Sequence, residues 1–265
     1  MIRKRTFFFA AVLLWSGLSR AQQITVAAAS DLQFVLPEVA ARFQRDSGIS
    51  AKLIFGSSGN FFGQIGNGAP FDLFFSADSE YPRKLEAAGL AEPGTVYEYA
   101  VGRIVLWIPQ DSALDLNRGL TVLLDARVKK IAIANPEHAP YGRAAVAALQ
   151  HENLYEKVRD MLVLGENISQ AASFVTSGSA DVGIVALSLA IAPSMKERGK
   201  YVEIPGEDYP PIRQAAVILK SSQQKAAARR FLDYLKSPAI IELLKSYGFS
   251  LPPAADQPPH TRQVP

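Results

Sequence analysis

Short apolar segments alternate with helical segments along most of this 265-residue chain. Strands that alternate with helices indicate parallel sheets with helices on both faces, so the order of the segments predicts an α/β fold. The first expected helix starts at Pro37, because a proline would break a helix interior. The expected strands are residues 24–28, 51–55, 72–76, 103–108, 130–134, 161–164 and 181–185. The expected helices are residues 37–45, 80–88, 143–154, 168–176 and 225–236.

The composition excludes several classes of protein. An apolar fraction of 48% supports a real core and excludes global disorder, and the length allows one large domain or two of ordinary size. The chain has no cysteine, so a disulfide framework, a thiolate nucleophile and an iron–sulfur cluster are excluded. Its three histidines, His138, His151 and His260, leave little material for a histidine-rich metal site.

The first 21 residues have the pattern of a secretory signal peptide. Basic residues 3–5 precede an apolar run over 7–15, and small residues stand at Ser19 and Ala21. The run is shorter than the roughly 20 residues that span a bilayer, although a retained N-terminal anchor is the alternative. Cleavage after Ala21 removes four basic residues and no acid, so the formal charge falls from +3 to −1 and nucleic-acid binding loses its support. We expect a periplasmic protein.

Polar and small residues follow four of the expected strands. In parallel α/β sheets, ligands bind beyond the carboxyl ends of the strands, where helices begin. A helix N-terminus presents unpaired N–H groups and about half a positive charge, so several that converge can hold a small anion without a cationic side chain. Each serine alone is most often an ordinary N-cap, whereas four such junctions together favour an anion site. The junctions are residues 29–32, 56–60, 135–142 and 165–169, with no lysine or arginine before Arg143.

Five segments, in this order and spacing, resemble those of the periplasmic molybdate-binding proteins of ABC transporters, which belong to the type II periplasmic binding proteins. The likeness extends from about residue 22 to residue 251. Two of the segments, GAPFDLFFSAD and NPEHAPYG, are quite specific. The segments are 26–30 (VAAAS), 56–59 (GSSG), 68–78 (GAPFDLFFSAD), 135–142 (NPEHAPYG) and 247–249 (YGF).

The resemblance implies a two-lobed periplasmic-binding-protein fold, with the ligand in the cleft between the lobes. Each lobe would hold a mostly parallel sheet flanked by helices. Lobe 1 would be residues 22–102 plus 213–251, lobe 2 residues 103–212, and residues 252–265 a flexible tail. The chain would cross between lobes near residues 99–103 and 210–214.

The resemblance also implies four oxyanion-binding residues. Ser30 and Ser58 would each give a hydroxyl and a backbone N–H, Tyr141 a backbone N–H and its hydroxyl, and Ile168 a backbone N–H. Molybdenum would be present only inside the bound oxyanion, and neither a cofactor nor a catalytic residue is implied. Some family members carry a binding tyrosine where this chain has Ala186, and the hydroxyl of Tyr141 is our hypothesis for its replacement.

The implied function is capture of molybdate, together with tungstate, for delivery to the membrane permease of an ABC importer by a monomeric protein. A site made only of donors suits a dianion without a proton, whereas hydrogen phosphate would leave its proton unpaired at a cost of roughly 1–3 kcal/mol. The alternatives are binders of another oxyanion, such as sulfate or thiosulfate. A ferric site is disfavoured because it requires tyrosinate, carboxylate and imidazole ligands.

A secreted hydrolase is the more distant alternative. Asp31 stands beside Ser30 in one junction, and His138 lies near Tyr141 in another junction. However, the chain has no G-x-S-x-G elbow, and neither His138 nor His151 has a neighbouring acid that completes a triad. Asp72 and Asp78 flank an expected strand, and we interpret them as caps or turn formers. We therefore expect no enzymatic activity.

Overall fold

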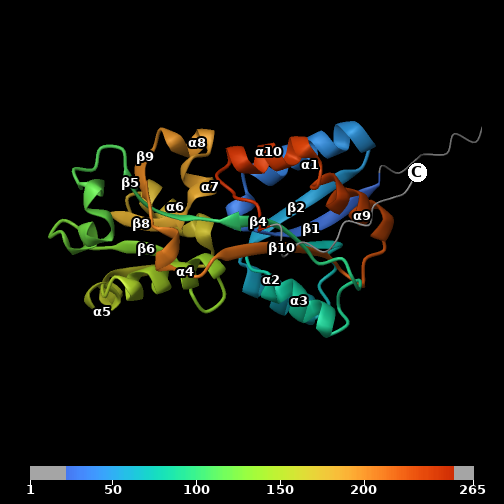
Figure 1. Ribbon diagram of the computed structural model, residues 1–265, viewed down its shortest axis with the longest axis horizontal. Helices are drawn as coiled ribbons and strands as arrows, with labels where there is room; N and C mark the ends of the chain where they lie inside the picture. The colour runs from blue at the N-terminus through green and yellow to red at the C-terminus, as the bar shows by residue number, and fades with distance from the viewer. Residues whose placement is uncertain (1–21, 254–265) are drawn as a thin grey trace, which may run out of the picture.

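The computed structural model describes residues 22–253, and within them two five-stranded sheets form two lobes (Figure 1). The expectations for the signal peptide and for the tail beyond residue 253 lie outside the described residues. The predicted two-lobed α/β fold is confirmed, because each sheet has helices packed against it. No helix among residues 22–253 is long and apolar enough to cross a membrane.

The first lobe contains the sheet with strand order β2-β1-β3-β10-β4. Its strands are β1 (Gln23–Ala29), β2 (Ser50–Gly56), β3 (Leu73–Ser76), β4 (Tyr97–Gly102) and β10 (Ile212–Ile218). Its helices are η1 (Ser30–Leu32), α1 (Val35–Ser47), α2 (Ser58–Gly66), α3 (Glu80–Ala87), α9 (Lys225–Tyr234) and α10 (Pro238–Ser246). The last strand and the last two helices thus join this lobe from the far end of the chain.

The second lobe contains the sheet with strand order β7-β6-β8-β5-β9. Its strands are β5 (Ile104–Pro109), β6 (Ile131–Ala134), β7 (Leu162–Gly165), β8 (Val182–Ala186) and β9 (Gly199–Glu203). Its α-helices are α4 (Pro140–His151), α5 (Tyr155–Val158), α6 (Ile168–Thr176), α7 (Leu187–Ala190) and α8 (Pro193–Lys196). Three 3-10 segments complete it: η2 (Leu116–Leu124), η3 (Arg159–Met161) and η4 (Gly206–Asp208).

One strand in each sheet runs against its neighbours. β10 is antiparallel to β3 and β4, and β5 is antiparallel to β8 and β9, whereas the other ladders are parallel. Both reversed strands are those that the chain enters from the other lobe. Such a strand starts at the cleft, whereas the parallel strands end there, so its direction is opposite. The carboxyl ends of β1, β2, β6 and β7 therefore face the space between the lobes.

Two helices begin earlier than the sequence predicts, and both contain a proline in the first turn. α1 starts at Val35 rather than at Pro37, and α4 starts at Pro140 rather than at Arg143. The first four N–H groups of a helix have no partner within the helix, so a proline there loses no hydrogen bond. Pro140 is the first residue of α4, which brings the next residue, Tyr141, to the helix N-terminus.

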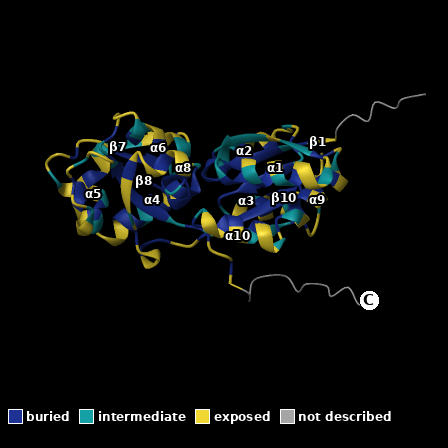
Figure 2. Ribbon diagram, turned by 90° about the horizontal axis from the view of Figure 1, so that it is seen from above, coloured by how far each residue is buried: buried dark blue, intermediate teal, exposed yellow. Residues whose placement is uncertain are grey.

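The buried side chains lie on the strands and on the inner faces of the helices (Figure 2). In β1 the larger side chains, Ile24 and Val26, face the helices α1 and α9, while Ala27 faces α2 on the other side of the sheet. Phe75 packs against Tyr99 and Phe231 in the same core. Because both faces are covered, the sheet is rigid support for the residues that follow its strand ends.

Candidate functional site

All four predicted oxyanion-binding residues line one small cavity between the lobes. Ser30 and Ser58 reach it from the first lobe, and Tyr141 and Ile168 reach it from the second lobe. All four residues are buried. The remaining lining residues are small or polar: Ala29, Asp31, Gly56, Ser57, Ala77, Ala139, Pro140 and Asn167.

In the first lobe, both serines come directly after a parallel strand. Ser30 begins η1 after β1, and Ser58 begins α2 after β2. The Oγ of Ser58 accepts a hydrogen bond of 2.9 Å from the backbone N–H of Ala77. Since the oxygen already accepts this bond, the hydroxyl proton of Ser58 is left to donate to a ligand.

In the second lobe, two helices direct their N-termini at the cavity. Tyr141 is the second residue of α4, and Ile168 is the first residue of α6. Asn167 is the N-cap of α6 and accepts a hydrogen bond of 3.1 Å from the N–H of Gln170. Together with α2, three helix N-termini thus meet at the cavity, and their unpaired N–H groups make it electropositive without a cation.

Direct hydrogen bonds join the lobes beside the cavity. The Oγ of Ser169 donates to the carbonyl oxygen of Ser30 at 2.9 Å, and the Oγ of Ser30 donates to the Oδ1 of Asn167 at 3.1 Å. On the other side, the Oγ of Ser57 donates to the carbonyl oxygen of His138 at 2.6 Å. These contacts describe a closed arrangement in which both lobes contribute to one enclosed site.

The hydroxyl of Tyr141 has partners other than the cavity. It donates to the Oδ2 of Asp31 at 3.0 Å and accepts from the Nε2 of Gln214 at 2.9 Å. Gln214 also donates to the same Oδ2 of Asp31 at 2.7 Å and accepts from the hydroxyl of Tyr99 at 2.7 Å. The structure therefore does not support the hypothesis that this hydroxyl replaces the tyrosine absent at Ala186. The backbone N–H of Tyr141 remains the candidate donor.

Asp31 is the buried acid of the site. Burial raises the pKa of Asp31 to about 6, although the hydrogen bonds from Gln214 and Tyr141 act in the opposite direction. Burial, and next the nearby charge of Asp31, raise the pKa of Tyr141 well above its ordinary value. The sequence places Asp31 in the junction 29–32 and in the hydrolase alternative, but does not predict its role in the lining of the cavity. The available signal was its position directly after Ser30.

Comparisons with known proteins agree on one family. A family model described as a bacterial extracellular solute-binding protein matches residues 24–250. The chain belongs to this family. Among its relatives, the molybdate-binding protein ModA of Azotobacter vinelandii is 40% identical over 91% of this chain and 96% of its own length. ModA of Rhodobacter capsulatus is 39% identical over 86% of this chain and 88% of its own length.

A solved structure supports the same conclusion about the fold. The periplasmic molybdate-binding protein of Azotobacter vinelandii matches with a TM-score of 0.82 and 37% sequence identity. The match covers 87% of this chain and 100% of that chain. The expected family and its two-lobed fold are thus confirmed, and the relatives are named as binding proteins rather than as enzymes.

The charged residues near the cleft of this solute-binding protein are paired with each other. Arg143 on α4 forms an ion pair with Asp78 of the first lobe and donates to the hydroxyl of Tyr81. Asp78 also accepts at 2.7 Å from the N–H of Glu80, the first residue of α3. Among residues 22–253, no lysine or arginine lines the cavity. The site therefore relies on neutral donors.

His138 belongs to the rim of the cleft. Its Nδ1 lies 2.9 Å from the Oγ of Ser57, and its Nε2 lies 3.7 Å from a carboxylate oxygen of Glu166. Ser57 donates its own proton to the carbonyl oxygen of His138, so the hydroxyl is held as part of the contact between the lobes. Such a pair stabilises the closed state, because it joins the two lobes.

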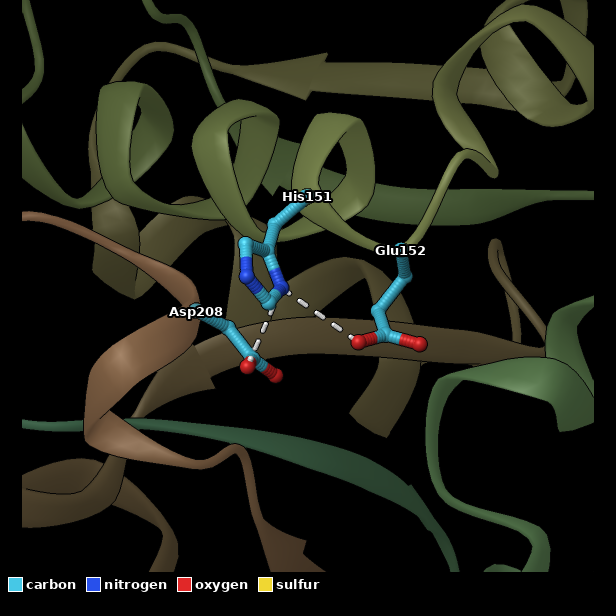
Figure 3. A group of neighbouring side chains, drawn as sticks. All are labelled: His151, Glu152 and Asp208. Atoms are coloured by element: carbon cyan, nitrogen blue, oxygen red, sulfur yellow. Dashed lines mark ion pairs between the residues drawn. The ribbon is translucent and has the colours of Figure 1, made fainter.

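A second cluster of polar side chains lies at the other end of α4 (Figure 3). The Nδ1 of His151 lies 3.2 Å from a carboxylate oxygen of Asp208 and 3.4 Å from one of Glu152. Both acids contact the same nitrogen, while His151 and Glu152 are exposed. The contact joins the C-terminus of α4 to η4, which precedes the crossing into β10, and we assign it a structural role.

Proposed function

We propose that this chain is an extracytoplasmic solute-binding protein that captures molybdate, and also tungstate, for an ABC importer. One observation carries the proposal: residues from both lobes enclose a single small cavity lined by helix N-termini and hydroxyl groups, without a cationic side chain. The 40% identity to a protein named for molybdate binding supports the choice of oxyanion.

The donors of the cavity suit a tetrahedral dianion. A hydrogen bond to a charged group contributes about 1.5–3 kcal/mol, so five bonds of about 1.8 kcal/mol each give about 9 kcal/mol before ordering costs. This free energy corresponds to a dissociation constant of about 1 μM or somewhat lower, which is sufficient for a scavenger. The backbone N–H groups of Ser30, Ser58, Tyr141 and Ile168 and the hydroxyl of Ser58 would supply these donors. The hydroxyl of Ser30 donates to Asn167 instead.

The anion would also stabilise the closed arrangement. A ligand shifts a two-state equilibrium only through contacts that it makes in one of the states. An oxyanion bound between Ser58 of the first lobe and Ile168 of the second contacts both lobes only when the cleft is closed. The closed form would then be the form that the membrane permease of the importer recognises.

The periplasm is the compartment that fits this proposal. The relative with the solved structure is named a periplasmic protein, and residues 1–21 have the pattern of an export signal. We propose that the mature protein works as a monomer that meets its permease at the membrane surface.

Calorimetric titration with molybdate, tungstate, sulfate and phosphate tests the function. We expect molybdate and tungstate to bind with dissociation constants of about 1 μM or lower, and sulfate and phosphate to bind much more weakly. Tighter binding of sulfate would move the protein to the alternative oxyanion class. Absence of binding to all these anions would contradict the proposal, and turnover of an ester or phosphate substrate would revive the hydrolase alternative.

A further inference from the structure

The carboxyl group of Asp31 has one satisfied oxygen and one unsatisfied oxygen. Its Oδ2 accepts hydrogen bonds from Gln214 and Tyr141 at 2.7 and 3.0 Å. Its Oδ1 is buried and has no hydrogen-bond partner among the described residues. The residue is only 1% exposed and belongs to the lining of the oxyanion cavity. A buried polar atom without a partner costs free energy, so Oδ1 is available to a ligand atom in the cavity that Asp31 lines.

The charge state of this carboxyl decides whether the cavity can hold a dianion. An ionised carboxylate in the lining would repel the anion, and the repulsion is strong where water is excluded. A neutral carboxyl group would instead be one more hydrogen-bond donor. Because two donors already point at Oδ2, the proton of the neutral form belongs on Oδ1, the oxygen without a partner.

We propose that Asp31 is a specificity-determining residue that binds the oxyanion as a neutral acid, with the proton on Oδ1 donated to an anion oxygen. The inference rests on the proposed function. It adds that, when Asp31 is ionised before binding, the protein takes up one proton from solvent with each dianion that it binds. No covalent bond of the anion is broken, because the proton stays on Oδ1 and is shared in the hydrogen bond.

Hydrogen bonds from Gln214, from Tyr141 and from its own backbone N–H favour the ionised form of Asp31, and no charged group is among the causes of its pKa shift. The titratable side chains that face it are Tyr141 and Tyr99, and both are neutral hydroxyls whose pKa values burial raises well above the ordinary range. The elements packed against η1 are β2, α6 and α7. Neither α6 nor α7 has a titratable residue. Lys52 lies opposite Thr25 in the ladder between β1 and β2, four residues before β2 ends at the cavity.

The geometry also separates two kinds of oxyanion. Molybdate and tungstate bring no proton and accept the one on Asp31. Hydrogen phosphate brings its own proton and would need an ionised Asp31 as acceptor. The two cases respond oppositely to pH, since the first needs the acid form of Asp31 and the second its base form.

The test is calorimetry with molybdate at pH 6, 7 and 8, each in two buffers with different ionisation enthalpies, on the wild type and on Asp31→Asn. At the pKa of about 6 that Asp31 has in the closed structure, its neutral fraction falls from about one half at pH 6 to about 1% at pH 8. The dissociation constant should therefore rise about 50-fold over this range, with uptake of about one proton at pH 8.

Asp31→Asn imitates the neutral acid, because its amide oxygen can accept from Gln214 and Tyr141 while its NH₂ group takes the place of the protonated Oδ1. The variant should bind molybdate with an affinity that is constant from pH 6 to pH 8 and without proton uptake. Asp208→Asn is the matched control, since burial also raises the pKa of Asp208 but the residue lies at the other end of α4. This control should keep the pH dependence of the wild type.

The outcomes separate the inference from the proposed function. Tight molybdate binding that is independent of pH and takes up no proton would overturn the inference and leave the function in place. The inference is equally overturned if Asp31→Asn keeps the pH dependence, or if hydrogen phosphate fails to compete better with molybdate as the pH rises. No molybdate binding at any pH would overturn both. The proton uptake of the wild type on molybdate binding tests the inference even if Asp31→Asn does not fold.

Discussion

The side-chain amide of Gln214 donates a hydrogen bond of 2.7 Å to the carboxylate of Asp31, although the two residues are 183 positions apart in the chain. Gln214 lies on β10, the strand that returns from the second lobe, and Asp31 directly follows Ser30 at the end of β1. Tyr141 of the second lobe completes the contact by donating to the same oxygen. The network thus connects the strand that crosses between the lobes, the anion cavity and the partner lobe.

Removal of the hydroxyl of Ser58 should weaken molybdate binding and leave the fold intact. In Ser58→Ala the anion loses one charged hydrogen bond, so we expect a loss of about 1.5–3 kcal/mol in binding free energy by calorimetry. Ser173→Ala, an exposed serine on α6 that bonds only its own helix, serves as control and should bind as the wild type does. An unchanged affinity in Ser58→Ala would remove this residue from the site.

Tyr141→Phe distinguishes a structural hydroxyl from a ligand-binding one. The change removes the donor to Asp31 and the acceptor of Gln214, and we expect a loss of about 1–3 kcal/mol in the free energy of unfolding. The affinity for molybdate at pH 6 should change little, because the backbone N–H remains. Since the hydrogen bond from Tyr141 lowers the pKa of Asp31, its loss should move the pH dependence of binding to higher pH. A large loss of affinity at pH 6 would instead place the hydroxyl on the anion.

The pH dependence of stability should reveal Asp31 in the absence of ligand. The folded-state pKa of Asp31 is raised to about 6, so the folded protein holds this proton more tightly than the unfolded chain does. Its contribution to the free energy of unfolding therefore falls as the pH rises from about 4 to about 6, by at most about 3 kcal/mol. Chemical denaturation should show Asp31→Asn to be more stable than the wild type at pH 8 and little different at pH 4. If Asp31→Asn and the wild type were equally stable at both pH values, the raised pKa of Asp31 would be contradicted.

Gly59→Ala should hold the lobes apart. A Cβ atom at Gly59 would stand 2.7 Å from the carbonyl oxygen and 2.9 Å from the Cα of His138, which belongs to the other lobe. The clash exists only in the closed state, so we expect the molybdate affinity to fall about tenfold or more with little change in thermal stability. Gly63→Ala on the same helix is the matched control, because its Cβ would meet nothing within 4 Å.

Small-angle scattering checks the physical cause of that loss. With saturating molybdate, the wild type and Gly63→Ala should become more compact, and Gly59→Ala should not. If Gly59→Ala closes normally and binds as tightly as the wild type, the contact between Gly59 and His138 does not limit closure.

The features predicted from the sequence are those that depend on neighbouring residues. Alternating strands and helices predicted the α/β class, whereas the two lobes were implied by the resemblance to a known family. Serines or small residues after strands marked the junctions that carry Ser30, Ser58, Tyr141 and Ile168. These signals are local because a helix N-terminus presents unpaired N–H groups whatever lies around it. The structure places all four junctions at one cavity.

The role of the hydroxyl of Tyr141 and the environment of Asp31 follow from contacts between distant parts of the chain. The charge state of Asp31 depends on its burial and on hydrogen bonds from Gln214 and Tyr141, which approach from other parts of the chain. Nothing within a few residues of Asp31 specifies either partner. The position of an anion-binding loop can be predicted from nearby residues, whereas the protonation of a buried group results from the packing of the whole molecule.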